Sequence, residues 1–312
     1  MHRDSSQGYK TLLGRMFTGD ATSILKSSVM EEHKGKVQLI FTSPPFPLNR
    51  KKKYGNRQGD DYMEWLASCA TLFCSYLTDT GSIVIELGNA WEPKRPVMST
   101  LALRSLLAFL DEGDLYLCQQ FVCHNPARLP SPAQWVNVER IRVKDAFTHV
   151  WWMSPNDRPK ANNRRVLTEY STSMKQLLRS RKYSAGKRPS EHNIGRASFL
   201  KDNNGAIPAN VLVLPNTRAN DSYQEYCRQH GLPIHPSRMP PGAAEFFIKL
   251  LTEPGDLVLD PFAGSNTTGA VAEQLGRRWV SIEIDESYVM GSQSRFISSD
   301  HSDHRAETGY NR

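Results

Sequence analysis

A short stretch of the chain combines a hydroxyl group, two prolines and an aromatic ring. It spans residues 42–46 and follows an apolar run, residues 37–41, that predicts a buried parallel strand. Two successive prolines fix φ and donate no N–H group, so neither a helix nor a continuing strand can form there. The carbonyls of Ser43 and Pro44 should therefore face a ligand or solvent.

A planar heterocycle that carries an amino group suits this strand end. Its ring can stack on Phe46, while its amino hydrogens are accepted by the Ser43 hydroxyl and the Pro44 carbonyl. The alternative is a Pro-Pro turn that ends a strand and has no function. The pentapeptide alone does not decide between the two interpretations.

A second stretch, far along the chain, has the composition of a nucleoside-binding turn. It follows the apolar residues 257–259, runs from Asp260 to Gly269, and precedes a helical stretch that ends near Leu275. A second apolar strand, residues 279–284, then contains Glu283. Such a βαβ unit places backbone N–H groups at a helix N-terminus, and the acid can accept from ribose hydroxyls. A nucleoside is the expected ligand, and an ordinary Gly-rich turn is the alternative.

Together the two motifs resemble those of the DNA amino-methyltransferases. In that family a Ser/Asp/Asn-Pro-Pro-aromatic strand end holds the base, and a loop similar to Asp-Pro-Phe-x-Gly-Ser-Gly-Thr holds S-adenosylmethionine. The similarity runs from about Phe17 to Phe296, and the catalytic motif precedes the cofactor loop, as in the β group. The resemblance implies a Rossmann-like, doubly wound, mostly parallel α/β sheet with an inserted target-recognition region.

The resemblance also implies a reaction. A serine before Pro-Pro goes with N4 of cytosine in this family, so Ser43 favours a bacterial restriction-modification enzyme that methylates cytosine in double-stranded DNA. Such an enzyme protects host DNA from the restriction endonuclease that acts on the same site. N6-adenine methylation, a catalytically silent DNA-binding protein, and methylation of RNA or of a protein glutamine are the alternatives.

Roles for individual residues follow from the same resemblance. The catalytic residues would be Ser43, Pro44, Pro45 and Phe46. The residues that hold S-adenosylmethionine would be Asp20, His235, Pro236, Asp260, Pro261, Phe262, Gly264, Ser265, Asn266, Thr267, Thr268 and Glu283. Asp20 could instead cap a helix, and His235 could be structural. Asn266 stands where the family commonly has Gly, but Asn tolerates positive φ, so the loop can keep its shape.

The chemistry implied needs no covalent intermediate. An exocyclic amine is a poor nucleophile because its lone pair is delocalised into the ring. Two fixed acceptors, the Ser43 hydroxyl and the Pro44 carbonyl, would favour a pyramidal nitrogen and aim its lone pair at the methyl group. A nucleophilic cysteine is unnecessary, and the chain contains no Pro-Cys dipeptide. The base must leave the duplex, so the ring of Phe46 would replace part of the lost stacking.

Positive charge is concentrated in one part of the chain. The net charge is +7, and residues 156–204 hold twelve Lys and Arg against four Asp and Glu, a net charge of +8. This imbalance favours an anionic partner. We expect DNA contacts from Arg50, Lys51, Lys52, Lys53, Asn125, Arg188, His192, Arg196 and Lys201. A solvated insertion is the alternative for the basic segment. Asn125 lies in a long turn punctuated by prolines, which could help to hold the extruded base. Equally, Asn125 could serve only to satisfy hydrogen bonds within that turn.

Composition and patterning define the expected organisation. The sequence predicts a flexible N-terminus (1–10), a catalytic half (11–154), a target-recognition insertion (155–233), a cofactor-binding half (234–297) and a disordered tail (298–312). Five cysteines form no CxxC pair, which favours reduced thiols in a cytoplasm and argues against a disulfide framework or a zinc site. No apolar run approaches the roughly 20 residues of a membrane span. Monomer and dimer both remain open.

Overall fold

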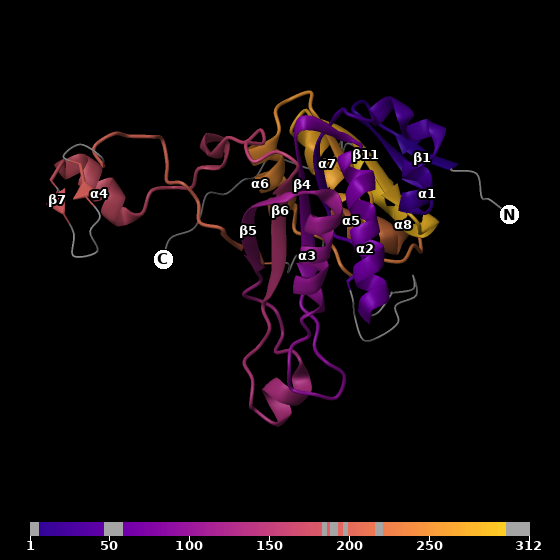
Figure 1. Cartoon of the computed structure of the whole chain (residues 1–312), viewed down its shortest axis with the longest axis horizontal. Helices are drawn as coiled ribbons and strands as arrows, with labels where there is room; N and C mark the ends of the chain where they lie inside the picture. Colours follow the sequence, from indigo (N-terminus) through magenta and orange to yellow (C-terminus); the bar gives the residue numbers. More distant parts are fainter. Residues whose placement is uncertain are drawn as a thin grey trace.

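The computed structural model describes residues 6–46, 59–182, 186–187, 193–195, 199–215 and 221–297. Within these ranges, nine strands form one mixed sheet in the order β1-β2-β11-β10-β3-β4-β6-β5-β9 (Figure 1). The strands are β1 (Ser6–Lys10), β2 (Gly14–Thr18), β3 (Val37–Thr42), β4 (Leu77–Gly88), β5 (Tyr116–His124), β6 (Phe147–Ser154), β9 (Val211–Val213), β10 (Leu257–Asp260) and β11 (Arg278–Glu283). A separate small hairpin pairs β7 (Gly186–Lys187) with β8 (Asn193–Ile194).

The centre of the sheet is parallel. Strand β3 lies between β10 and β4 and pairs with both in parallel, and β11 pairs in parallel with β10 and β2. Strand β6 runs antiparallel to β4 and β5, and β1 runs antiparallel to β2. Every residue of β3 is buried, as expected for a strand covered on both faces. The prediction of a mostly parallel α/β sheet is confirmed.

Helices cover both faces of this sheet. One face carries α1 (Ala21–Leu25), α2 (Gly59–Cys74) and α3 (Leu101–Gly113), and the other carries α6 (Pro241–Leu251), α7 (Thr267–Gln274) and α8 (Glu286–Ser292). Side chains alternate along each strand, so that Ile83 and Ile85 pack toward the first set and Val84 toward the second. Full burial of such an apolar side chain contributes roughly 1.5–3 kcal/mol. The two cores fix the strand ends that carry the motifs.

Several element boundaries differ from those that the sequence predicted. The N-terminal segment was expected to be loosely ordered to Lys10, but Ser6–Lys10 form the edge strand β1. Tyr9 explains the difference, because its ring is buried and its hydroxyl bonds to Ser292 at 2.8 Å. The apolar pattern predicts a helix from about Tyr62 to Leu77, but α2 ends at Cys74, since Leu77 already begins β4. The pattern also predicts a helix from roughly Val97 to Leu110, whereas α3 spans Leu101–Gly113.

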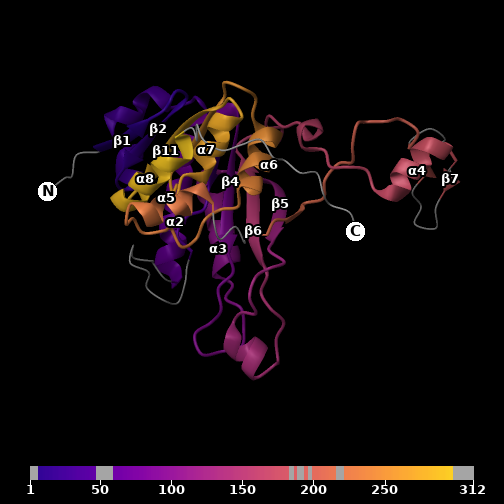
Figure 2. The same ribbon diagram turned by 180° about the vertical axis from the view of Figure 1, so that it is seen from behind.

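Two projections leave the body of the molecule (Figures 1 and 2). The first, which we call the arm, consists of residues 89–100 and 124–147 and extends beyond the ends of β4 and β5. The second carries α4 (Thr172–Ser180) and the β7–β8 hairpin. The chain then returns through β9, which pairs with β5 at the sheet edge, and α5 (Ser222–Gln229). No helix within the described ranges has the length and apolarity needed to cross a membrane.

Candidate active site

A buried hydrogen bond joins the two sequence motifs. Strands β3 and β10 are parallel neighbours, so their carboxyl ends lie at the same edge of the sheet. At that edge the Thr42 hydroxyl donates to Oδ1 of Asp260 at 2.7 Å, and both side chains are buried. The Ser-Pro-Pro-Phe strand end and the Asp260 loop therefore meet, although 218 positions separate these two residues in the sequence.

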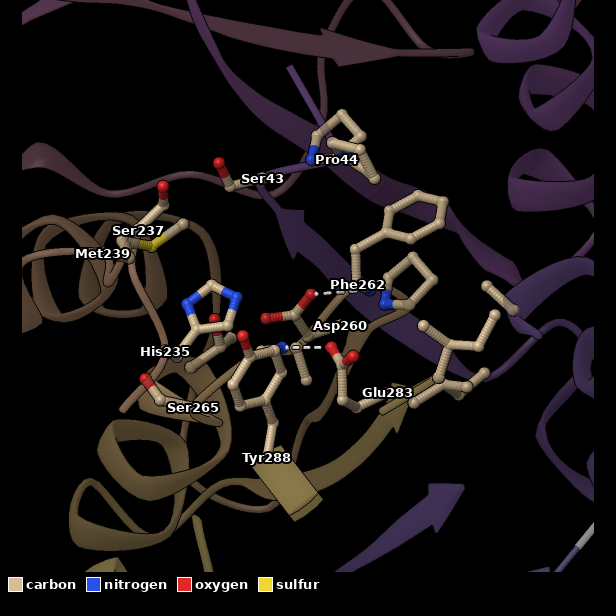
Figure 3. A pocket seen from close by; sticks show the side chains of 18 of the residues that line it. Ser43, Pro44, His235, Ser237, Met239, Asp260, Phe262, Ser265, Glu283 and Tyr288 are labelled. Atoms are coloured by element: carbon tan, nitrogen blue, oxygen red, sulfur yellow. Dashed lines mark hydrogen bonds between the residues drawn. The ribbon is translucent and has the colours of Figure 1, made fainter. Parts of the chain in front are cut away.

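A cavity of about 290 Å³ lies where the motifs meet (Figure 3). Small-molecule sites typically span roughly 300–1,000 Å³, so its size is at the lower end of that range. Fourteen of the sixteen residues predicted for catalysis or cofactor binding line it: Asp20, Ser43, Pro44, Pro45, Phe46, His235, Asp260, Pro261, Phe262, Gly264, Ser265, Thr267, Thr268 and Glu283. The lining does not include Pro236 or Asn266, both of which lie among the described residues.

The strand end from Ser43 to Phe46 forms one wall of the cavity. Pro44 is buried, whereas Ser43 and Phe46 are partly exposed. Figure 3 shows Ser43 and Pro44 on the side of the cavity opposite Glu283 and Tyr288. The ring of Phe46 packs over the end of β4, where a Cβ atom added to Gly88 would come within 2.6 Å of it. Gly88 thus permits the aromatic ring to lie directly against the sheet.

Glu283, at the end of β11, bonds to the loop that follows Asp260. Its Oε2 accepts the backbone N–H of Gly264 at 2.8 Å, and its Oε1 accepts that of Asp285 at 2.9 Å. Burial raises the pKa of Glu283, and this effect is the larger one. The hydrogen bonds from the two N–H groups act in the opposite direction, because they favour the charged form. A carboxylate has about four acceptor positions, so both oxygens can still accept from a ligand hydroxyl.

Gly264 occupies a position that other residues could not fill without strain. Its φ is +53°, and an added Cβ would lie 2.9 Å from Cε1 of His235. The His235 ring in turn packs edge-on against Tyr288, with 4.7 Å between ring centroids. A side chain at this position would therefore push into the wall formed by the two rings.

Asn266 supports the loop from beneath. Its φ is +53°, which agrees with the expectation that Asn can replace Gly in this turn. Its side chain is fully buried and caps α7, accepting the N–H of Gly269 at 3.2 Å and the hydroxyl of Ser281 at 2.8 Å. Its amide nitrogen donates to the Tyr9 hydroxyl at 2.9 Å. Asn266 therefore shapes the loop, and its predicted contact with a cofactor stays a prediction.

Two further carboxylates in the cavity wall have contrasting environments. Burial raises the pKa of Asp260 to about 6, even though hydrogen bonds from Thr42, Thr268 and the Phe262 N–H lower it. Asp20 is the N-cap of α1, and its Oδ1 accepts from Ser23 N at 2.8 Å. Burial raises the pKa of Asp20, but the hydrogen bonds from Thr22 and Ser23 outweigh it and lower the pKa overall. The capping role considered for Asp20 is observed, and the cavity contact is compatible with it.

Sequence reasoning missed several lining residues. They include Tyr62, Trp65, Ser237, Met239, Ile282, Ile284 and Tyr288. The aromatic residues of α2 recur at helical spacing, which predicts that they pack in the core, but the Trp65 ring also packs on Phe262 with 5.5 Å between centroids. A helical pattern cannot distinguish a core aromatic from one at a cavity rim. Tyr288 carried no motif of its own.

Glu86 is a further residue that the sequence motifs did not indicate. Thr42 pairs with Ile85 in the β3–β4 register, so Ser43 and Glu86 are the next residues on neighbouring strands. Glu86 is buried, and its Oε1 accepts the hydroxyl of Thr148 at 2.8 Å. Burial raises the pKa of Glu86, while that hydrogen bond and the positive charge of Arg128 lower it. An acid within an apolar strand was the signal available in the sequence.

The predicted DNA contacts are only partly described. Arg50, Lys51, Lys52, Lys53, Arg188, His192 and Arg196 lie outside the described residues. Lys201 is exposed on the second projection. Asn125 lies at the base of the arm, where its Oδ1 accepts the N–H of Ala127 at 3.1 Å. The proline-punctuated turn that follows it contributes no residue to the cavity lining. All of these DNA contacts stay predictions.

Fold and cavity together define an α/β enzyme of the methyltransferase class. The chain belongs to the DNA methylase family of N6 and N4 enzymes, whose pattern matches residues 37–294. It is 42% identical over 306 residues to the type II methyltransferase M.PvuII of Proteus hauseri, and the match covers 97% of this chain and 90% of the relative. The predictions of the family and of the Rossmann-like fold are confirmed.

Solved structures agree with this assignment. The structure of PvuII DNA methyltransferase, described as cytosine-N4-specific, superimposes with a TM-score of 0.76 at 36% identity and covers 96% of this chain and 92% of that one. M1.HpyAVI, crystallised as a complex with SAM, gives a TM-score of 0.54 at 18% identity, with 91% of this chain and 100% of that chain covered. The second likeness concerns the fold alone.

Proposed function

We propose that this protein transfers a methyl group from S-adenosylmethionine to N4 of a flipped-out cytosine in double-stranded DNA, as the modification enzyme of a restriction-modification system. The observation that carries the proposal is the shared cavity, in which the Ser43 strand end and the Asp260 loop face one another. The similarity to M.PvuII and to a cytosine-N4-specific structure supports N4 of cytosine as the acceptor. The partner endonuclease would cut the same DNA sequence when it is unmethylated.

The residues of the cavity fit S-adenosylmethionine. Glu283 retains acceptor capacity for the two ribose hydroxyls, and Asp20 lies in the lining as an acceptor for the adenine amino group. Phe262 and Ile284 add apolar surface for the adenine ring. The absence of a side chain at Gly264, beside the His235 ring, leaves backbone accessible to the ligand. When bound, S-adenosylmethionine supplies an electrophilic methyl group on a sulfonium sulfur.

The residues of this chain orient the target amine and accept the proton that it loses. The Ser43 hydroxyl and the Pro44 carbonyl accept the two hydrogens of the target amine, which directs the nitrogen lone pair away from the ring plane. The face of Phe46 takes the place of part of the stacking that the flipped base loses. Methylation leaves the amine with a proton to lose. We assign its acceptance to Glu86, which is next to Ser43 in the register of the neighbouring strands and lies behind the residues that line the cavity.

DNA recognition is assigned to the segment between the two halves of the catalytic domain. Residues 155–233 carry the largest positive excess, and much of the segment stands away from the sheet as the second projection (Figure 2). Phosphate contacts by its Lys and Arg side chains would hold the duplex, and Asn and Arg side chains would read base edges. Strand β9 anchors the end of this segment to β5.

Nucleoside mass spectrometry tests the proposal directly. Unmethylated genomic DNA is incubated with the protein and S-adenosylmethionine, digested to nucleosides and analysed. N4-methylcytosine is the expected product. N6-methyladenine in its place would contradict the base assignment, and retention of DNA without any transferred methyl group would indicate a silent DNA-binding protein.

A further inference from the structure

The arm leaves the same edge of the sheet as the active-site cavity. Strand β4 enters it after Gly88, β5 enters it after His124, and β6 leaves it at Phe147. In the sheet order β4 is the neighbour of β3, whose carboxyl end carries Ser43. Both views show the arm extending from the body on this side, in magenta (Figures 1 and 2).

The base of the arm touches the catalytic strand end. Phe46 packs against Gly88, the last residue before the arm begins. The positive charge of Arg128, within the arm, is close enough to Glu86 to lower the pKa of that carboxyl. A molecule that occupies the cavity mouth and extends beyond the end of β4 would therefore meet the arm.

Hydrogen bonds between its segments hold the arm in a defined conformation. Asp145 accepts from the Asn89 side chain at 2.8 Å, and the Arg142 guanidinium donates to the Pro96 carbonyl at 2.9 Å. The Lys144 ammonium donates to the carbonyl of Pro126 at 3.0 Å. The first two bonds join residues 89–100 to residues 124–147, and the third joins the two ends of residues 124–147. Together they stabilise the conformation of the arm.

The surface of the arm is apolar and basic at once. Six apolar side chains of the arm are exposed: Val97 by 37%, Met98 by 46%, Leu129 by 80%, Val138 by 68%, Ile141 by 47% and Val143 by 86%. Exposed apolar surface that is rimmed by polar residues is a known mark of interaction sites. The arm also holds six Lys and Arg against three Asp and Glu, a net charge of +3. A polyanion with an apolar interior, such as stacked duplex DNA, matches both properties.

We propose that the arm grips duplex DNA beside the target base, with Leu129 and Val138 entering the space that the flipped base vacates and Arg95 and Arg140 contacting phosphates. The inference rests on the proposed function, because only a substrate whose base must leave a stack needs such a wedge. Val138 ends a short helical turn, Gln134–Val138, at the tip of the arm. Arg95 and Arg140 are both at the surface of the arm. Apolar wedges between base steps are a known device of proteins that distort DNA.

The wedge is tested with the double variant Leu129→Ala and Val138→Ala. Both side chains are exposed, so the fold should be unaffected, and Leu107→Ala, on the exposed face of α3, is the matched control. The methylated sequence is first located by sequencing DNA treated with the wild-type protein. On a matched duplex we expect kcat/KM to fall about ten-fold in the double variant and to stay unchanged in the control.

A mismatched duplex separates a wedge from a general loss of binding. A mismatch opposite the target cytosine lowers the cost of extruding the base, so it should restore most of the activity of the double variant. Wild-type activity of the double variant on the matched duplex would overturn the wedge, as would a loss that the mismatch does not repair. If the wild type sediments as a dimer and the double variant as a monomer, the arm binds a second copy and the proposal is wrong.

The phosphate contacts have a separate readout. In Arg95→Ala combined with Arg140→Ala, the slope of log K against log salt should fall by about two, since each phosphate contact contributes about 0.9. Lys26→Ala, at the end of α1, is the control cation and should leave the slope unchanged. An unchanged slope in the arm variant would overturn this half of the inference. Methylation by the wild type and the controls shows in every case that the proposed function itself stands.

Discussion

Thr42 and Asp260 are joined by a hydrogen bond of 2.7 Å inside the sheet, one at the end of β3 and the other at the end of β10. The bond ties the strand end that would hold the base to the loop that would hold the methyl donor. Because both groups are buried, the distance between the two motifs is set by the core and not by a flexible surface loop.

Thr42→Val should weaken this link. The variant keeps the shape of the side chain but removes one of the hydrogen bonds to Asp260, and a hydrogen bond to a charged group contributes about 1.5–3 kcal/mol. We expect a loss of that size in the free energy of unfolding, measured with urea. Thr42→Ser retains the hydroxyl and should lose much less. A free energy of unfolding in Thr42→Val equal to that of the wild type would contradict the stabilising role of the hydrogen bond.

Asp260 should give the protein a characteristic pH dependence. Burial raises its pKa from 3.8 to about 6, so between these values the folded state binds a proton that the unfolded state has lost. Its contribution to stability is therefore greatest below about pH 4 and declines as the pH rises to about 6, by roughly 3 kcal/mol. Asp260→Asn removes the titration. The difference in unfolding free energy between wild type and variant should change across pH 4 to 6 and stay level above it; a constant difference would contradict the raised pKa.

Gly264→Ala should impair cofactor binding. Alanine at φ +53° is strained, and its Cβ would lie 2.9 Å from the His235 ring. We expect the Kd for S-adenosylmethionine, measured by calorimetry, to rise at least ten-fold. Gly35→Ala is a matched control, because Gly35 also has a positive φ, +67°, but has open space around it. If both variants bound the cofactor equally well, the close approach at Gly264 would have no role.

Glu86→Gln tests the proton acceptor. Glutamine has a similar size and can still accept from Thr148, so folding should be preserved. Because burial raises the pKa of Glu86, the ionised form that accepts a proton becomes populated as pH rises, and wild-type kcat should increase through that pKa. The variant should show a kcat lower by about 10²–10⁴-fold and should lose this rise with pH. A pH profile identical in shape to that of the wild type would remove Glu86 from the reaction.

The sequence was most informative where local chemistry determines backbone geometry. The prolines at 44 and 45 must end β3, and the turn from Asp260 to Gly269 must open a helix, so the residue types alone place both motifs at strand ends. Parallel pairing then brings strand ends together. The shape of the loop at Asn266 was predictable for a similar reason, because few residues other than Gly and Asn adopt its positive φ.

Residues that act through tertiary contacts gave weaker signals. Trp65 follows the same helical pattern as core residues, and its place at the cavity rim depends on how α2 packs over Phe262. Glu86 became meaningful only through its register with Ser43. Tyr9, in a polar segment expected to be loose, is buried because its ring packs on Trp279 and Phe296, and its hydroxyl bonds to Ser292 and Asn266. None of these relationships can be derived from spacing along one chain.

The most direct test compares Ser43→Ala with the wild type in two assays on the same preparation, one of methyl transfer from labelled S-adenosylmethionine to DNA and one of cofactor affinity. Ser43 lines the cavity at the base-binding end, apart from the carboxylate of Glu283. We expect methyl transfer to fall by about 10²–10³-fold, the usual effect of removing one fixed hydrogen-bonding group at the reacting centre, with an unchanged cofactor Kd. Full methyl transfer by the variant, or loss of cofactor binding in place of transfer, would contradict the role given to the strand end.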